Sequence, residues 1–424
     1  MKGVSEASAS LPYLQQFHEE ILRCGRCGFC QSACPVYRVT GREASVARGH
    51  FAHARALLEG QVDLNEDLQA ALFECLLCKA CTSQCFGALN THQVLVAARH
   101  EYIRRHGLPA SLRWLFRHLL PNPRRMARLL RAIRLGKRTR LADAADRLRV
   151  LRWVSAQAAA ANRVFDTLPS QFLVDLVHSR HLGPDGAPRR VAYFMSCGHN
   201  FALPQVGQAA LRTLLAANCR VEILQNNCCG LPAWAYGDLE GARLLARKNL
   251  KTLSSLDADL IVTDCGSCYS FLKSYPTLLS NDPDAIWLAS KVHEFTQFAL
   301  DAPPPSHSTP VSVTYHDPCH LSRYQDLRQA PREILRRTPG VHFTELPEAD
   351  WCCGAAGTYN IFHYDQSMKI LERKMANIRS TGAEVVVTSC PACIIQLRCG
   401  ARLFNVPVRV AHLAQLISPA PSNP

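Results

Sequence analysis

The chain has 424 residues, of which 48% are hydrophobic and 20 are cysteines, and its formal net charge is +14. This length is enough for about two to four domains, and the apolar content is ordinary for a globular protein. The cysteines recur at short spacings that suit metal ligands in a reducing compartment better than a disulfide scaffold. The N-terminus lacks a basic stretch followed by an apolar core, so we expect no secretory signal. The sequence has no apolar run of about 18 residues or more, so we expect no membrane span.

A short helix is expected over 11–23, and it leads into the most informative part of the sequence. The run CGRCGFCQSACP covers 24–35, and a second run, CLLCKACTSQC, covers 75–85. Both have the spacing C-x2-C-x2-C-x3-C, which is typical of bacterial ferredoxins. Between and after the runs, the apolar pattern predicts helices at Ala44–Glu59, Asp67–Phe73 and Val94–Arg105.

Cubane 4Fe-4S clusters explain this spacing, because three cysteines on a tight loop hold three corners and the fourth ligand comes from the other run. The predicted ligands of cluster 1 are Cys24, Cys27, Cys30 and Cys85, and those of cluster 2 are Cys75, Cys78, Cys81 and Cys34. Zinc and disulfides are the alternatives, but zinc sites usually pair two shorter C-x2-4-C knuckles. Phe86 follows the second run where a proline would match Pro35. Proline is not a ligand, so this departure loosens the turn without threatening the cluster. We expect residues 1–98 to form an α-helical two-cluster ferredoxin domain.

Residues 99–185 are predicted to be a basic helical linker. Residues 99–153 hold 16 Lys and Arg against three acidic residues, which is almost the whole excess charge of the chain. An amphipathic helical pattern runs through 107–165 and is broken at Pro121 and Pro123. Two interpretations remain open. The apolar side packs on the neighbouring domains with its charges solvated, or the basic side contacts a membrane surface or an acidic partner. No recognised nucleic-acid motif accompanies the charge.

From about residue 186, short apolar strands alternate with helices, which predicts α/β layers around a parallel sheet. The prolines at 303–305 and 310 mark a joint between two domains, which we place at 186–300 and 306–418. The predicted strands are Arg190–Met195, Arg220–Leu224, Asp259–Thr263, Val311–His316, Val341–Leu346 and Glu384–Thr388, and the helices are Leu203–Ala217, Leu239–Ser254, Arg332–Arg337 and Gln366–Ser380.

The cysteines show that these two units are an internal repeat. The first unit contains Cys197, Cys228, Cys229, Cys265 and Cys268, and the second contains Cys319, Cys352, Cys353, Cys390 and Cys393. Matching positions are 122, 124, 124, 125 and 125 residues apart. An offset this constant indicates a duplication of about 124 residues.

Each unit is expected to bring its five cysteines together, since Cys197, Cys265 and Cys390 follow predicted strands, and sheets of this kind build sites at their carboxyl edge. Five thiolates are one more than a cubane or a tetrahedral zinc uses, so an adjacent pair could share or bridge metals. The glycine after each pair is expected to supply an unusual turn or close approach. A structural zinc site or a reactive thiol pair is the alternative. His199, His316 and His320 lie beside these cysteines as alternative ligands or proton carriers, whereas Cys219 and Cys399 are expected to be ordinary buried residues.

Taken together, the motifs CGRCGFCQSACP, CLLCKACTSQC, NNCCGLPAWAYGD, YHDPCHLSRYQ and CCGAAGTYN resemble those of a known family. A two-cluster ferredoxin domain followed by two cysteine-rich CCG domains is similar to the iron–sulfur subunit of glycolate oxidase. It also resembles related lactate-oxidation proteins and the CCG subunits of heterodisulfide reductase. Many glycolate oxidase subunits lack part of the CCG cysteine set. Both sets are complete here, which is closer to heterodisulfide reductase and its noncubane clusters.

The resemblance implies an electron-transfer subunit with two 4Fe-4S clusters and one or two further noncubane clusters or zinc ions at the CCG sites. A partner subunit would bind FAD and oxidise glycolate or lactate, because this chain has no G-x-G-x-x-G fingerprint. Electrons would pass to a quinone or another acceptor, and no catalytic base is expected in this chain. The resemblance implies a cytoplasmic protein with a possible peripheral membrane contact. Two alternatives remain: a disulfide reductase that uses a CCG cluster, and a structural or assembly protein whose CCG units hold zinc.

Overall fold

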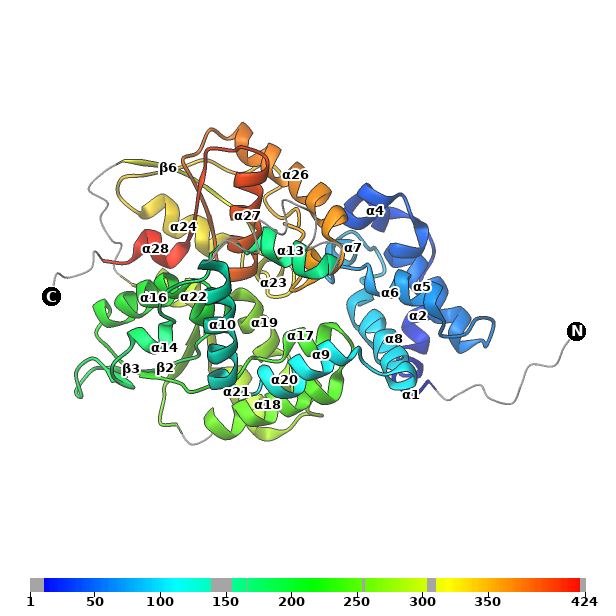
Figure 1. The fold of residues 1–424 in the computed structure, drawn as a ribbon, viewed down its shortest axis with the longest axis horizontal. Helices are drawn as coiled ribbons and strands as arrows, with labels where there is room; N and C mark the ends of the chain where they lie inside the picture. The colour runs from blue at the N-terminus through cyan, green and yellow to red at the C-terminus, as the bar shows by residue number, and fades with distance from the viewer. Residues whose placement is uncertain (1–10, 139–154, 166, 254–255, 303–309, 420–424) are drawn as a thin grey trace, which may run out of the picture.

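The computed structural model describes residues 11–138, 155–165, 167–253, 256–302 and 310–419. It has a helical N-terminal domain and two α/β repeats, which lie one above the other beside it in Figure 1. The linker helices α10 (Pro123–Arg138) and α13 (Ala156–Val164) cross the face of the two repeats that is turned to the viewer. Among the described helices, none combines the length and the apolar character that crossing a bilayer would require.

The N-terminal domain is built from short helices around the two cysteine runs. The predicted helix at 11–23 is two helices, and the one at Ala44–Glu59 begins as a separate 3-10 turn. A buried apolar cluster that includes Leu14, Leu72 and Leu95 joins the first helix to α6 and α8. The elements are α1 (Pro12–Gln15), α2 (His18–Leu22), α3 (Phe29–Ala33), α4 (Pro35–Thr40), η1 (Glu43–Ser45), α5 (Ala47–Leu58), α6 (Glu66–Phe73), α7 (Ala80–Ser83) and α8 (Thr91–His106).

The apolar side of the linker packs on both repeats. The amphipathic pattern forms α9 (Ala110–Trp114), a π-helical turn η2 (Leu115–Leu119) and α10, with the predicted break at Pro121 and Pro123. Leu112 and Phe116 join the core of the first repeat, and Val164 of α13 joins that of the second. The part of the predicted helix at 139–154 lies outside the described residues. Packing on the domains is therefore confirmed, while a membrane or partner contact of the basic side stays a prediction.

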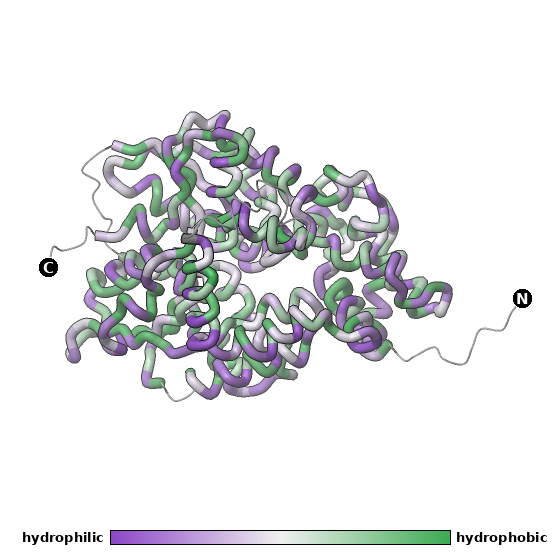
Figure 2. Tube along the Cα trace, viewed as in Figure 1, coloured by the Kyte–Doolittle hydropathy of each residue, from purple (hydrophilic) through white to green (hydrophobic). Residues whose placement is uncertain are grey.

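The first repeat has a sheet in the order β1-β3-β2-β4-β5. All pairs are parallel except β1 with β3, which is antiparallel. The strands are β1 (His181–Leu182), β2 (Arg189–Tyr193), β3 (Cys219–Ile223), β4 (Leu260–Thr263) and β5 (Val292–Glu294). The helices are α14 (Leu173–Leu176), α15 (Cys197–Phe201), α16 (Pro204–Ala216), α17 (Leu231–Ala235), α18 (Leu239–Leu253), α19 (Gly266–Lys273), α20 (Tyr275–Leu278), α21 (Pro283–Lys291) and α22 (Phe295–Leu300). Figure 2 shows hydrophilic residues along the lower margin of the molecule, near α18 and α21.

The second repeat has an all-parallel sheet in the order β7-β6-β8-β9, which matches β3-β2-β4-β5 strand for strand. This common order confirms the internal duplication. The strands are β6 (Val311–Tyr315), β7 (Val341–Phe343), β8 (Val385–Thr388) and β9 (Arg409–His412). The helices are α23 (Cys319–Ser322), α24 (Gln329–Arg337), α25 (Tyr359–Phe362), α26 (Tyr364–Ser380), α27 (Pro391–Leu403) and α28 (Leu413–Ile417).

One apolar core joins the two repeats. It contains Val191 and Tyr193 from the first sheet together with Val313, Tyr315 and Val387 from the second. Helix α16 packs against α28, and α22 packs against α24. The repeats therefore form one packed unit. The exact domain boundaries stay predictions, and the joint at 303–305 lies outside the described residues.

Candidate metal centres

The thiols predicted to bind cluster 2 come together in the structure. Cys34 lies close enough to Cys75, Cys78 and Cys81 to interact electrostatically with all three. Burial raises the pKa of Cys75 to about 11 and that of Cys81 to about 12. These thiols therefore hold their protons at pH 7 unless a metal displaces them. The backbone N–H of Leu77 donates to Cys75 Sγ at 3.3 Å, as N–H groups do around iron–sulfur clusters.

Three of the four predicted cluster 1 ligands are likewise neighbours. Cys24 and Cys27 both interact electrostatically with Cys30, whose pKa burial raises. Cys85 follows α7, which packs on α3, the helix that carries Cys30. This set is the more open of the two in the ferredoxin domain, because Cys27 is exposed and the other three are half-buried.

The five cysteines of each repeat form a continuous series of contacts. In the first repeat the thiols touch in the order Cys197–Cys228–Cys229–Cys268–Cys265. In the second, the order Cys319–Cys352–Cys353–Cys393–Cys390 is the same. The glycine after each adjacent pair has a left-handed backbone, with φ of 103° at Gly230 and 86° at Gly354, as the sequence predicted.

Cys197, Cys265 and Cys390 follow strands, as expected, but Cys197 lies further from its strand than the sequence predicted. Strand β2 ends at Tyr193, and Cys197 is instead the first residue of α15. Cys265 and Cys390 are the residues just before α19 and α27. The thiols thus lie at the N-termini of helices, where the exposed N–H groups favour a thiolate and hence metal binding.

His316 fits the second repeat as a further ligand. A ring nitrogen of His316 and the sulfurs of Cys353 and Cys393 lie within 4.8 Å of one another. Burial lowers the pKa of His316 to about 3, so its imidazole is neutral. Within the described residues, neither ring nitrogen has a hydrogen-bond partner. A neutral, unpartnered imidazole beside two thiols is a donor set that suits iron or zinc.

His199 differs, since its Nδ1 lies 2.8 Å from Asp264 Oδ1. His320 is half-buried, and its partial desolvation lowers its pKa to about 4.

The cysteine sets touch one another across the domain interfaces, which the sequence did not predict. The Cys78 thiol of the ferredoxin domain contacts the Cys352 thiol of the second repeat. The Cys390 thiol of the second repeat contacts the Cys265 thiol of the first. Gly198 allows the repeats to approach this closely, because a Cβ at this position would lie 2.6 Å from the ring of Pro391.

Two buried arginines fasten the ferredoxin domain to the repeats. Arg99 donates to the carbonyl oxygens of Leu72, Cys75 and Ala235, at 2.9, 2.8 and 2.6 Å, and so links α6 and the second cysteine run to the first repeat. Arg323 of the second repeat donates to the Cys78 carbonyl at 3.3 Å. Because a cation beside thiolates stabilises their negative charge, Arg323 also favours metal binding at this contact.

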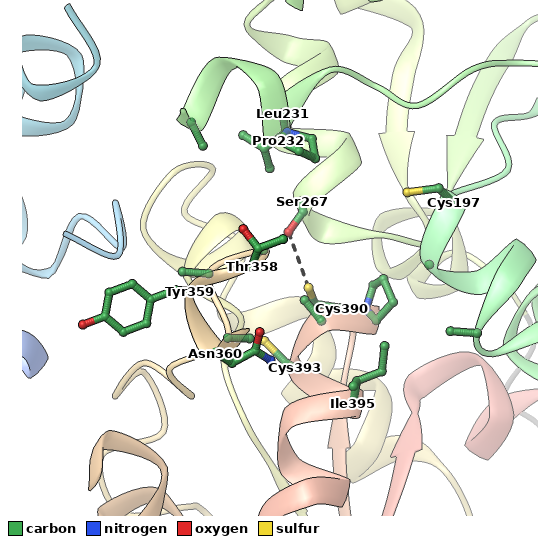
Figure 3. A pocket seen from close by; sticks show the side chains of 18 of the residues that line it. Cys197, Leu231, Pro232, Ser267, Thr358, Tyr359, Asn360, Cys390, Cys393 and Ile395 are labelled. Atoms are coloured by element: carbon green, nitrogen blue, oxygen red, sulfur yellow. Dashed lines mark hydrogen bonds between the residues drawn. The ribbon is translucent and has the colours of Figure 1, made fainter. Parts of the chain in front are cut away.

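A cavity of about 960 Å³ opens where the two repeats meet. Figure 3 shows Cys390 and Cys393 from one repeat and Cys197 and Ser267 from the other along its wall, with Ser267 Oγ 3.4 Å from Cys390 Sγ. The cavity extends beyond the thiols to apolar residues of the linker and to polar and aromatic residues that follow the paired cysteines of the two repeats. These are Met126, Leu130, Ile133, Ala161, Tyr236, Tyr359 and Asn360.

A buried carboxyl group near the cavity predicts a pH effect. Burial raises the pKa of Glu294 to about 8, and its Oε2 accepts from the Thr296 N–H at 2.6 Å. The native state therefore keeps a proton that the unfolded chain loses near pH 4.5. Stability must then fall as pH rises between about 4.5 and 8, by at most about 1.4 kcal/mol per pH unit.

The variant Glu294→Gln lacks this titration. We expect the free energy of unfolding of the wild type, measured by urea denaturation, to fall by about 2 kcal/mol more than that of the variant between pH 6 and pH 8. Equal losses in the two proteins would show that Glu294 is not protonated in the native state.

Comparisons with known proteins agree with the order of a ferredoxin domain, a linker and two cysteine-rich repeats. The family model "4Fe-4S dicluster domain" matches residues 20–88, "Cysteine-rich domain" matches 191–273 and 313–398, and "Glycolate oxidase iron-sulfur subunit, linker region" matches 109–165. The chain is 32% identical over 417 residues to the probable glycolate oxidase iron-sulfur subunit of Bacillus subtilis (strain 168), covering 94% of this chain and 93% of the relative.

Shorter relatives match part of the chain. Lactate utilization protein A of Exiguobacterium sp. is 31% identical over 240 residues, which are 54% of this chain and 96% of the relative. Among solved structures, a hypothetical protein from Helicobacter pylori has a TM-score of 0.41 at 10% identity over 57% of this chain and 51% of its own, which is too weak to indicate a shared fold. Because the Bacillus subtilis relative aligns along nearly the whole of both chains, and the linker model matches as well, this chain belongs to the family of glycolate oxidase iron–sulfur subunits.

Proposed function

We propose that the chain is the electron-transfer subunit of a flavin-dependent 2-hydroxy-acid dehydrogenase that oxidises glycolate or lactate. The observation that carries this proposal is the unbroken series of thiol contacts from the ferredoxin domain, through Cys78 and Cys352, to Cys390 and Cys265. When bound, iron–sulfur clusters at these sites supply one-electron transfer. The role of the chain is to hold four cysteine sets close together and to bury the inner ones.

The proposed ligands are the eight ferredoxin cysteines in the two sets given above and the five cysteines of each repeat. Cys219 and Cys399 stand apart from these sets and are buried, as the sequence predicted. The FAD would lie on a partner subunit. We also propose a cytoplasmic protein in which the basic side of the linker meets the membrane surface, because that side carries most of the excess positive charge.

Metal content tests this proposal directly. We expect anaerobically purified protein to contain about 16 iron and a matching amount of acid-labile sulfide per chain, from four sites of four iron each. Electron paramagnetic resonance of the same sample should show signals distinct from cubanes. About 8 iron with two zinc would limit electron transfer to the ferredoxin domain and make the repeats structural. Iron near zero in a folded sample would overturn the proposal.

The cavity between the repeats is the proposed site of the electron acceptor. Its walls are mainly apolar, and they contain cysteines of both repeats, so a quinone could bind there within reach of either set. A pocket of this kind favours a flat, apolar acceptor over a small hydrophilic one.

Filling the cavity should weaken quinone binding without disturbing the cysteines. Ala161 of α13 lines the cavity, whereas Ala156 of the same helix is exposed and does not. We expect Ala161→Phe to raise the KM for a short-chain quinone about tenfold, which corresponds to ~1.4 kcal/mol, and to leave ferricyanide reduction unchanged. Ala156→Phe is the matched control. An unchanged quinone KM in Ala161→Phe would place the acceptor elsewhere.

A further inference from the structure

The ferredoxin domain exposes two phenylalanines at its surface. Phe86 is 85% exposed, the highest value among the large apolar side chains of the described residues, and Phe29 is 53% exposed. Their rings meet edge to face with centroids 5.0 Å apart. Single exposed apolar residues are common, but two large aromatic side chains held together in water suggest a binding surface.

This aromatic pair lies beside the most open cysteine set. Phe29 is the first residue of α3 and precedes Cys30, while Phe86 follows Cys85 directly. Phe86 is also the residue that occupies the place of a proline in the second cysteine run. An exposed ring next to a cluster ligand supplies a reason for that departure.

The local structure holds the pair in place. Helix α3 packs against α7, which precedes Cys85 and Phe86. The side chain of Arg23 donates to the carbonyl oxygen of Gly87 at 3.0 Å and fixes the turn after Phe86. Preorganised aromatic residues lose little conformational freedom on binding, which is why they are frequent at the centres of protein interfaces.

The order of the cysteine sets indicates which kind of partner binds at the aromatic pair. Cluster 1 is reached from outside at the exposed Cys27, whereas every cysteine that the repeats contribute is buried except Cys197 and Cys319, which are half-buried. Cys30 and Cys81 interact electrostatically, so the open set is continuous with the inner ones. An electron donor therefore approaches the outer end of the series, where the aromatic pair lies.

We propose that Phe29 and Phe86 are the docking surface for the FAD-binding partner subunit. This inference rests on the proposed function, which assigns the flavin to a partner, and it adds the place where that partner binds. The partner should offer an apolar pocket for the two rings. The exposed Arg23, which contacts the turn after Phe86, and the exposed Arg26, three residues before Phe29, favour acidic residues around that pocket.

Binding of the flavoprotein tests the docking surface. A tagged chain is co-expressed with the FAD-containing subunit and isolated anaerobically, and the FAD retained per chain is measured. We expect Phe86→Glu and Phe29→Glu to lower the retained FAD about tenfold or more, as for interface hot spots. Iron per chain and reduction by dithionite should stay at wild-type values.

Ile286→Glu is the matched control, because Ile286 is an apolar residue of the first repeat that is 50% exposed. If Phe86→Glu loses iron, Phe86→Ala replaces it, since it adds no charge beside the cluster. Wild-type FAD retention in both phenylalanine variants would overturn the docking surface and leave the proposed function intact. If the wild-type complex retains FAD but glycolate and lactate do not bleach the iron–sulfur absorbance, the proposed function itself fails.

Discussion

Replacing Cys34 with serine is expected to remove about four iron per chain and to prevent electrons from reaching the repeats. Cys34 comes from the first cysteine run but lies among Cys75, Cys78 and Cys81 of the second. Losing this ligand leaves three thiols, which do not complete the four-thiolate set of a cubane. The Cys78 thiol is the one that contacts Cys352 of the second repeat. Loss of this cluster therefore interrupts the series of contacts between the ferredoxin domain and the repeats.

The measurement is iron per chain together with quinone reduction by the reconstituted complex. Electron paramagnetic resonance should still detect cluster 1 reduced by the flavoprotein. Cys219→Ser is the control, since Cys219 is buried, even more than the half-buried Cys34, but belongs to none of the four sets. Full iron content and wild-type quinone reduction in Cys34→Ser would show that Cys34 is not a ligand of this cluster.

The second large effect concerns stability. Arg332→Met is expected to lower the free energy of unfolding by about 3–5 kcal/mol, because it leaves a buried carboxylate without its partner. Both guanidinium NH2 groups of Arg332 donate to the two oxygens of Asp317, at 2.9 and 2.8 Å, and the same side chain reaches Glu345. Asp317 is buried two residues after β6, an inner strand of the second repeat, and two residues before Cys319.

Urea denaturation under anaerobic conditions measures this loss. Arg373→Met serves as the comparison, because the pair of Arg373 with Glu348 is about 40% exposed and such surface pairs contribute at most about 1 kcal/mol. The double variant Asp317→Asn with Arg332→Met should regain much of the stability. A loss in Arg332→Met no larger than that in Arg373→Met would contradict the prediction.

The cysteine sets could be predicted because their spacing is a local property of the chain. Three thiols on one loop must share a metal, and a constant offset between two series of cysteines must reflect a repeated fold. The alternation of strands and helices gave the parallel sheets for a similar reason. The sequence did not predict strands β1, β5 and β9, which have two, three and four residues and are too short to show a clear apolar pattern.

The contacts between the sets could not be predicted in this way. Cys78 with Cys352 and Cys265 with Cys390 depend on how separately folded surfaces pack, and no local spacing records that packing. The same holds for the cavity, whose walls combine the linker with both repeats. The sequence shows Gly198 beside Cys197, but it does not show why a glycine is required there. The reason is visible only in the packed structure, where Pro391 leaves no room for a Cβ at this position.

The two repeats descend from one unit, yet their matching cysteines no longer have matching neighbours. Both Cys352 and its counterpart Cys228 contact two cysteines of their own repeat, but Cys352 also meets the ferredoxin domain through Cys78. Under the proposed electron-transfer function, a duplication that began with two equivalent halves has thus become a polar assembly with an inlet half and an outlet half. Natural selection can then act on the two copies separately, and an exchange of equivalent segments between them would not preserve the direction of electron flow.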